Sequence, residues 1–304
     1  MRRLTLKQLQ TVRIVSQSGT VVAAAVEMNV TPAALTSRIK LLEEDAGIAL
    51  FDRAGGRLKL TDAGREVVNA TARIDLVLAE LENTLSAYRG MHAGRVTIGV
   101  VSTAKYFAPR LIAAFARENP RIEISISVGN RAEIVALLRD YTVDVALMGR
   151  PPVDFTAMSE AFGPHPQVII AAPDHPLVKR KGIDKAELSQ ESFIVREQGS
   201  GTRTIFDYFF DGIMVRHPRI SIEIGSNETI KQAVMAGLGI TLISAHTIQA
   251  EVAEGRLAVL DVKGMPIVRQ WFVVHRADRA LTLPAQAMWD FTVKEGRGFL
   301  PSLD

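Results

Sequence analysis

The sequence predicts an α/β protein with an all-α-rich N-terminal domain. Three features support this fold class: short capped helices open the chain, a long helix with a regular apolar seam follows, and strands then alternate with helices to the end. With 304 residues, the chain exceeds what one hydrophobic core usually organises. We therefore expect two or three domains.

The composition excludes several classes of protein. The chain has no cysteine, so disulfides and cysteine-ligated metal sites are excluded. Its opening sequence, MRRLTLKQLQ, lacks the apolar core of a signal peptide. No apolar stretch approaches the roughly 20 residues that span a bilayer. We expect a soluble, cytoplasmic protein without a membrane partner.

Basic residues gather near the N-terminus, although the net charge of the whole chain is only +3. Residues 1–60 hold nine Lys or Arg against five Asp or Glu, and the remainder is close to neutral. A small basic domain permits nucleic-acid binding, because neutralising phosphates supplies much of that affinity.

The first 30 residues predict two short helices. Thr5 and Gln8 have the spacing of a capping box at the start of the first helix. Thr20 can cap a second, alanine-rich helix, and Asn29 is a plausible left-handed stop for it. The small alanines allow the helices to pack closely.

A third helix and a hairpin complete this domain. Thr31 followed by Pro32 is a strong helix start, since a capping hydroxyl precedes proline at the first helical position. Residues 50–60 then form two short segments around Gly55-Gly56, and two glycines tolerate the positive φ of a tight turn. Three helices followed by a basic hairpin predict a winged helix-turn-helix.

A long helix is predicted from Thr61 to about Tyr88. Positions on one face recur at alternating four- and three-residue steps: Val67, Thr71, Ile74, Leu78, Leu81, Leu85 and Tyr88. Such a seam is typical of a coiled coil, with Thr71 its one polar member. The alternative is a core helix of one globular domain. The position of the helix before a change of composition favours a dimerising linker.

The rest of the chain predicts an α/β arrangement. The expected strands are VTIGVV, IEISISV, VDVALMG, QVIIAA, SFIVRE, ISIEIG, GITLIS and VRQWFVVHR. The expected helices lie near 104–118, 131–140, 202–213, 226–236 and 284–295. This alternation implies mainly parallel sheets, and there are enough strands for two sheets with a cleft between them. Ligands of such folds bind outside the carboxyl ends of the strands.

The chain resembles the LysR-type transcriptional regulators along its whole length. The matching segments are LKQLQTV, AAAVEMNVTPAALTSRIKLLEEDAGIALFDR, RLKLTDAGR and GRVTIGVV. Two further segments, FIVREQGSGTR and SNETIKQAVMAGLGITLIS, look like the subgroup that controls the Calvin-cycle carbon-fixation operon. The resemblance implies two Rossmann-like lobes of periplasmic-binding-protein type, with the chain crossing between them near 162–167 and 266–269.

The resemblance also implies domain boundaries and partners. The implied domains are a DNA-binding domain at 1–61, a linker helix at 62–90 and an effector domain at 91–304, whose lobe I comprises 91–165 and 268–304 and lobe II 166–267. The implied partners are double-stranded DNA with a pseudo-palindromic operator, a small metabolite and the chain itself, as a homodimer assembled into a homotetramer. RNA polymerase is a further candidate partner.

The N-terminal end of the third helix and the hairpin would contact DNA. In a winged helix-turn-helix, the start of the second helix of the motif faces base edges in the major groove. The candidate DNA-binding residues are Thr31, Pro32, Ala33, Thr36, Ser37, Arg38, Arg53 and Arg57. Family members often carry Gln, Pro and Arg at the positions of Pro32, Ala33 and Ser37. Because this sequence differs at those positions, we expect direct contacts to bases to contribute less to specificity and recognition of DNA shape to contribute more.

The effector cleft is expected where strand ends meet helix starts. Backbone amides and hydroxyls at helix N-termini bind anions, and arginine can add bidentate contacts, so we expect an anionic effector, with phosphorylated compounds as candidates, and no other cofactor. The candidate effector-binding residues are Ser102, Thr103, Lys105, Asn130, Gly199, Ser200, Gly201, Thr202, Arg203 and Asn227. Arg150, which opens an Arg-Pro-Pro stretch, is a candidate outside this set.

Two other functions are open to the same fold. An enzyme is disfavoured because the six histidines are scattered, with no H-E-x-x-H pair and no G-x-S-x-G elbow, so we expect no catalytic residue and no metal site. A solute-binding protein of the transport class would share the two-lobed domain. The N-terminal helix-turn-helix and the missing signal peptide argue against it.

Overall fold

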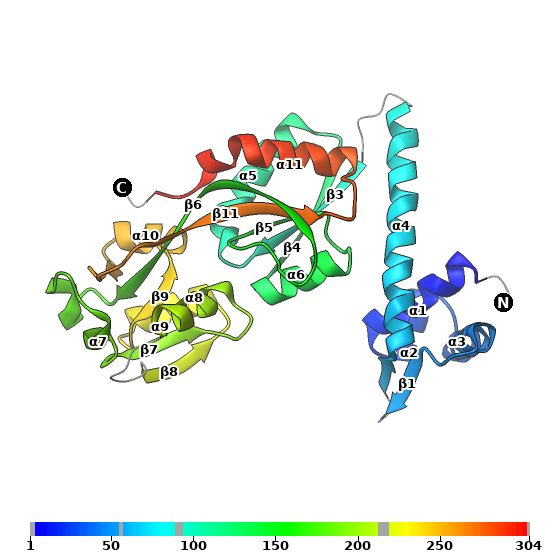
Figure 1. The fold of residues 1–304 in the computed structure, drawn as a ribbon, viewed down its shortest axis with the longest axis horizontal. Coiled ribbons are helices and arrows are strands. Elements are labelled where there is room, and N and C mark those ends of the chain that lie inside the picture. Colours follow the sequence, from blue (N-terminus) through cyan, green and yellow to red (C-terminus); the bar gives the residue numbers. More distant parts are fainter. Residues whose placement is uncertain (1–3, 55–56, 89–93, 212–218, 303–304) are drawn as a thin grey trace. The chain divides into compact units, whose positions relative to one another are not determined.

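A computed structural model describes residues 4–54, 57–88, 94–211, 219–302 of the chain. The chain divides into two compact units, Met1–Leu85 and Ser86–Asp304, and each is described by itself (Figure 1). No helix within the described residues is both long and apolar enough to cross a membrane.

The first unit contains three short helices, a hairpin and a long helix. Their bounds are α1 Leu6–Ser18, α2 Val21–Glu27, α3 Pro32–Ala46, β1 Phe51–Ala54, β2 Arg57–Leu60 and α4 Asp62–Tyr88. The predicted caps are present: the side chains of Thr5, Thr20 and Thr31 each accept a backbone N–H of the first turn. Asn29 has the predicted positive φ, of 54°. The predicted Gly55-Gly56 turn lies outside the described residues.

One apolar core holds the three short helices and the hairpin together. Val12 of α1, Ala24 of α2 and Leu35 of α3 are fully buried in it. Glu43 fixes the start of the hairpin, because its Oε1 accepts the backbone N–H groups of Leu50 at 2.8 Å and Phe51 at 3.1 Å.

The long helix α4 carries an apolar seam whose first part, at Val67 and Thr71, is covered by its own unit and whose later part is exposed. Thr71 is buried and its hydroxyl donates to the backbone O of Val67, so the polar member of the seam is satisfied within the helix. Further along, the seam positions Ile74, Leu78, Leu81 and Leu85 are exposed by 38–53%. At 1.5 Å per residue, the 27 residues of α4 extend about 40 Å.

The second unit is built from a seven-stranded sheet, a two-stranded sheet and the helices that cover them. Its longer elements are β3 Gly94–Val101, α5 Ala108–Glu118, β4 Ile122–Gly129, α6 Arg131–Arg139, β5 Val145–Met148, β6 Ala157–Ala171, β7 Ser192–Arg196, α8 Gly201–Phe209, β8 Arg219–Ile224, α9 Asn227–Met235, β9 Thr241–Ser244, β11 Ile267–Arg276 and α11 Leu283–Glu295. Short pieces complete the chain: η1 Ala104–Tyr106, η2 Pro176–Lys179, α7 Lys185–Leu188, η3 Ala245–Thr247, α10 Gln249–Ala253, β10 Ala258–Val259 and η4 Gly296–Phe299.

The larger sheet is mixed, whereas the strand–helix alternation predicts mainly parallel pairing. Its strand order is β10-β6-β11-β5-β3-β4, with β9 also paired to β6. β3 is parallel to both β4 and β5, but every pair that includes β6 or β11 is antiparallel. Strand β6 is also far longer than the predicted strand QVIIAA, because its first half pairs with β11.

Strands β6 and β11 join two lobes with separate cores. Lobe I packs β3, β4, β5, α5, α6 and α11 around one buried cluster that includes Phe107 and Trp271. Lobe II packs β7, β9, α8 and α9 around two clusters, one on each side of its strands. β6 and β11 run beside one another from lobe to lobe (Figure 1). A cleft between the lobes is therefore bordered by these crossing strands.

Candidate DNA-reading helix and effector cleft

Helix α3 exposes the predicted DNA-reading residues on one face. Pro32 is its first residue, and Thr31 caps it by accepting the backbone N–H of Ala34 at 3.2 Å. Thr31, Pro32, Ala33, Thr36, Ser37 and Arg38 are all exposed, whereas Leu35 and Ile39 face the core. The hydroxyl of Thr36 donates to the backbone O of Pro32 at 2.9 Å. Its remaining lone pairs face solvent and could accept from a base amino group or a water.

The hairpin carries the two predicted wing arginines. Arg53 pairs with Leu58 and Arg57 pairs with Ala54, so both arginines lie at the tip end of the ladder.

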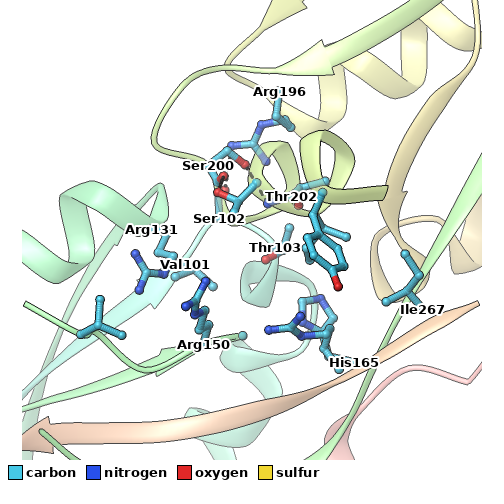
Figure 2. A pocket seen from close by; sticks show the side chains of 17 residues that line it. Val101, Ser102, Thr103, Arg131, Arg150, His165, Arg196, Ser200, Thr202 and Ile267 are labelled. Carbon is cyan, nitrogen blue, oxygen red and sulfur yellow. Dashed lines mark hydrogen bonds between the residues drawn. The ribbon is translucent and has the colours of Figure 1, made fainter. Parts of the chain in front are cut away.

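A cavity of about 520 Å³ lies between the two lobes (Figure 2). Volumes of roughly 300–1,000 Å³ are typical of small-molecule sites. Its lining comprises Val101, Ser102, Thr103, Arg131, Gly149, Arg150, Val153, His165, Arg196, Ser200, Gly201, Thr202, Thr204, Ile205, Tyr208, Ile267 and Arg269. Both lobes and both crossing strands contribute residues. Val101, Ser102 and Thr103 lie at the carboxyl end of β3, where ligands of α/β folds bind.

Five of the predicted effector-binding residues line this cavity. Ser102 and Thr103 follow β3 in lobe I, and Ser200, Gly201 and Thr202 form the start of α8 in lobe II. Ser200 caps α8, accepting the backbone N–H of Thr202 at 3.2 Å. Because the first residues of α8 line the cavity, the positive end of this helix dipole lies at the cavity wall.

The other five predicted residues do not line the cavity, and each of them contacts a neighbouring group. Lys105 pairs with Glu228, and Arg203 pairs with Asp207 and Glu223. The remaining three act on the backbone or on another cavity residue: Asn130 caps α6, the carbonyl of Gly199 accepts the N–H of Ala132, and Asn227 accepts from Arg196.

Four arginines line the cavity, and none of the described lining residues is acidic. Glu197 neutralises Arg196 through two contacts, at 2.7 and 2.9 Å. The other three arginines belong to lobe I or to β11: Arg131, Arg150 and Arg269.

Arg131 and Arg150 form a like-charged pair on one side of the cavity (Figure 2). Arg131 donates to the backbone O of Pro151 at 3.1 Å, and its Nε is buried without a hydrogen-bond partner. Burial, followed by the charge of Arg150, lowers the pKa of Arg131. An anion placed between the two guanidinium groups would offset both the lost hydration of Arg131 and the repulsion between the two positive charges.

His165 forms part of the wall on strand β6. It is 4% exposed; its Nε2 lies 3.0 Å from Ser244 Oγ and 2.8 Å from Gln167 Nε2, and its ring stacks on Trp271 at 3.8 Å. Burial lowers the pKa of His165 well below its usual value, so the ring is neutral at pH 7. Arg269 is its cross-strand neighbour on β11. Sequence reasoning missed both residues, since their position depends on the pairing of distant strands.

No group of three or more His, Asp or Glu side chains in the described part of the chain is arranged to hold a metal ion.

An exposed reading helix with a wing, together with a two-lobed cleft, defines a DNA-binding regulator with a small-molecule site. The family profile described as "Bacterial regulatory helix-turn-helix protein, lysR family" matches residues 6–65, and "LysR substrate binding domain" matches residues 89–297. The chain belongs to the LysR family of bacterial regulators. The first match also disfavours the transport-class alternative.

Relatives with established names are similar along nearly the whole chain. The HTH-type transcriptional regulator CbbR of Xanthobacter flavus is 48% identical, over 98% of this chain and 90% of its own length. The RuBisCO operon transcriptional regulator of Allochromatium vinosum is 39% identical, over 96% of each chain. The regulatory domain of Synechocystis CcmR, solved in complex with 2-PG, has a TM-score of 0.63 and 37% identity, over 66% of this chain and 95% of that one. All three relatives are named as regulators or as a regulatory domain.

Proposed function

We propose that this chain is a cytoplasmic regulator of carbon-fixation genes, controlled by an anionic metabolite bound between its lobes. The residues of the α3 face and the wing would contact a pseudo-palindromic operator, and a homodimer paired through α4 would assemble into a homotetramer. The bound metabolite can alter DNA binding only if it prefers one arrangement of that assembly.

The charge of the cavity is the observation that carries the anion proposal. Arginines without acidic neighbours in the described lining, beside a helix N-terminus, favour a phosphate or carboxylate group over a cation or a neutral compound. Ser102, Thr103, Ser200 and Thr202 add hydroxyls that can hydrogen-bond to the same group.

The relatives support the carbon-fixation role and suggest the first compounds to test. One relative is named for the RuBisCO operon, and another was solved with 2-PG. We therefore propose 2-PG, phosphorylated carbon-fixation intermediates and reduced nicotinamide phosphate cofactors as the first candidates.

Isothermal titration calorimetry of the full-length chain with these compounds is the direct test. We expect at least one of them to bind, and we expect Arg150→Gln to weaken its binding. No acidic residue within the described lining competes with a bound anion for the charge of Arg150. A matched control is Arg180→Gln, because Arg180 pairs with Glu187 on the surface of lobe II and does not line the cavity. Failure of every anion to bind, or equal effects of the two variants, would contradict the proposal.

A further inference from the structure

A second set of contacts ties the two lobes together outside the cavity. In lobe I, η1 follows β3 directly, and in lobe II, helix α9 begins at Asn227. The hydroxyl of Tyr106 in η1 donates to Glu228 Oε1 of α9 at 2.6 Å, and Lys105 Nζ lies 3.9 Å from the same oxygen. None of these three side chains lines the cavity.

Lys231 holds Glu228 in place from within lobe II. Lys231 is 3% exposed, and its Nζ lies 3.0 Å from Glu228 Oε2 and 2.8 Å from Glu251 Oε1. It also donates to the backbone O of Thr247 at 3.0 Å and lies 4.9 Å from the ring centre of Tyr106. A buried ammonium is tolerated only when its partners stay in place. Glu228 is therefore a fixed acceptor directed at lobe I, and we call Tyr106, Glu228 and Lys231 the clasp.

The clasp is continuous with the wall of the cavity. Arg196 donates to Ser102 Oγ at 3.2 Å, and the side-chain amide of Asn227 donates to the backbone O of Ser102 at 3.4 Å. Ser102 and Tyr106 lie in one short segment, and Asn227 and Glu228 are adjacent. Moving the clasp would therefore move Ser102, which lines the cavity.

A backbone hydrogen bond also joins the two lobes, beside the residues that line the cavity. The backbone N–H of Ala132, in the first turn of α6, donates to the carbonyl of Gly199 in lobe II at 3.1 Å. Gly199 has a φ of +88°, and a Cβ there would lie 3.0 Å from the Cβ of Ala132. This N–H belongs to lobe I, and its partner belongs to lobe II. Its protection from exchange therefore reports whether the lobes stay together.

We propose that Tyr106 and Glu228 are positioning residues that hold the two lobes at the angle at which both halves of the cavity face one ligand. They touch no ligand themselves. The apparent dissociation constant equals the intrinsic constant divided by the fraction of molecules in the competent arrangement. Loosening the clasp lowers that fraction and so weakens binding without changing a lining residue.

Hydrogen exchange of the full-length chain tests the clasp without any ligand. In Tyr106→Phe, which keeps the ring and loses the hydroxyl, peptides covering residues 130–133 should exchange faster than in the parent chain. Glu228→Gln should act in the same direction, since it removes the charge that Lys231 and Lys105 face. The matched control is Tyr141→Phe, whose hydroxyl donates to Asp278 at 2.9 Å within lobe I.

Tyr106→Phe leaves the ion pairs of Lys231 in place, so it should keep the urea midpoint of the parent chain to within the effect of the control. This separates a change of lobe angle from general unfolding. Equal exchange at residues 130–133 in Tyr106→Phe, Glu228→Gln and Tyr141→Phe would overturn the proposal. The proposal would also be overturned if exchange at residues 130–133 became faster in the clasp variants only together with exchange throughout the chain, as in global unfolding.

Binding of inorganic phosphate supplies a second measurement, which rests on the proposed anion site. Losing the hydrogen bond from Tyr106 to Glu228 should weaken phosphate binding by about two- to tenfold in Tyr106→Phe. Phosphate binding should be unchanged in Tyr141→Phe. Faster exchange with unchanged phosphate affinity would contradict the positioning role. Faster exchange in a chain that binds no phosphate would instead refute the anion site and leave the clasp standing on the exchange result.

Discussion

The exposed seam of α4 makes the strongest quantitative prediction about assembly. Leu78 and Leu81 are 38% and 53% exposed when the chain is taken alone. Burying the exposed half of a leucine side chain contributes about 1 kcal/mol. If two protomers pair through α4 as proposed, two such leucines in each would contribute about 4 kcal/mol to pairing, or roughly a thousandfold in the dimer dissociation constant.

Replacing both leucines with glutamate removes this contribution and also places unpaired charges at the interface. We expect Leu78→Glu with Leu81→Glu to give smaller particles in light scattering and to lose binding to a palindromic site. Arg73→Glu is the control, since Arg73 is exposed on α4 and lies outside the seam. An unchanged mass distribution in the double variant would show that the effector domains hold the oligomer without α4.

Three further predictions concern the two sites and pH. Thr36→Ala should cost roughly 1–3 kcal/mol of DNA-binding free energy, through one base position. Arg53→Ala should weaken binding to all DNA sequences alike and reduce the salt dependence of that binding. Unaltered operator affinity in both variants would refute the DNA contacts. Thr202→Val should weaken binding of the anionic effector at least tenfold in calorimetry, whereas Ser221→Ala, which removes a lobe II hydroxyl outside the cavity, should not. Burial lowers the pKa of His246 to about 4, so its contribution to stability is complete above the unfolded pKa of about 6.5 and is lost as the pH falls toward 4. Between pH 7 and pH 4.5, the parent chain should lose about 2–3 kcal/mol more of its free energy of unfolding in urea than His246→Asn does; an equal loss in the two chains would assign the effect to other groups.

The sequence predicts well those features that depend on local contacts. Each helix cap joins a side chain to a backbone group within three residues, as Thr31 and Ala34 do. The start of α8 is equally local, and Ser200, Gly201 and Thr202 do line the cavity. A capping hydroxyl and a helix start share one short segment, so their chemistry can be read without knowing the rest of the fold.

Features that depend on distant pairing could not be predicted in this way. His165 and Arg269 become neighbours only through the register of β6 against β11. Lys105 and Arg203 have the residue type expected of an anion site, yet Glu228 and Glu223 reach them from other elements and engage their charges. A local motif identifies the charge of a side chain, but only the fold determines which opposite charge it meets.

A gel-shift titration on DNA from upstream of the chain's own gene tests the central claim most directly. The full-length chain should bind this DNA specifically and with strong salt dependence. Adding the anion that binds in calorimetry should change the affinity or the mobility of the complex, and Thr202→Val should abolish that response while keeping DNA binding. Absence of specific binding, or specific binding that no cleft-bound anion alters, would contradict the account.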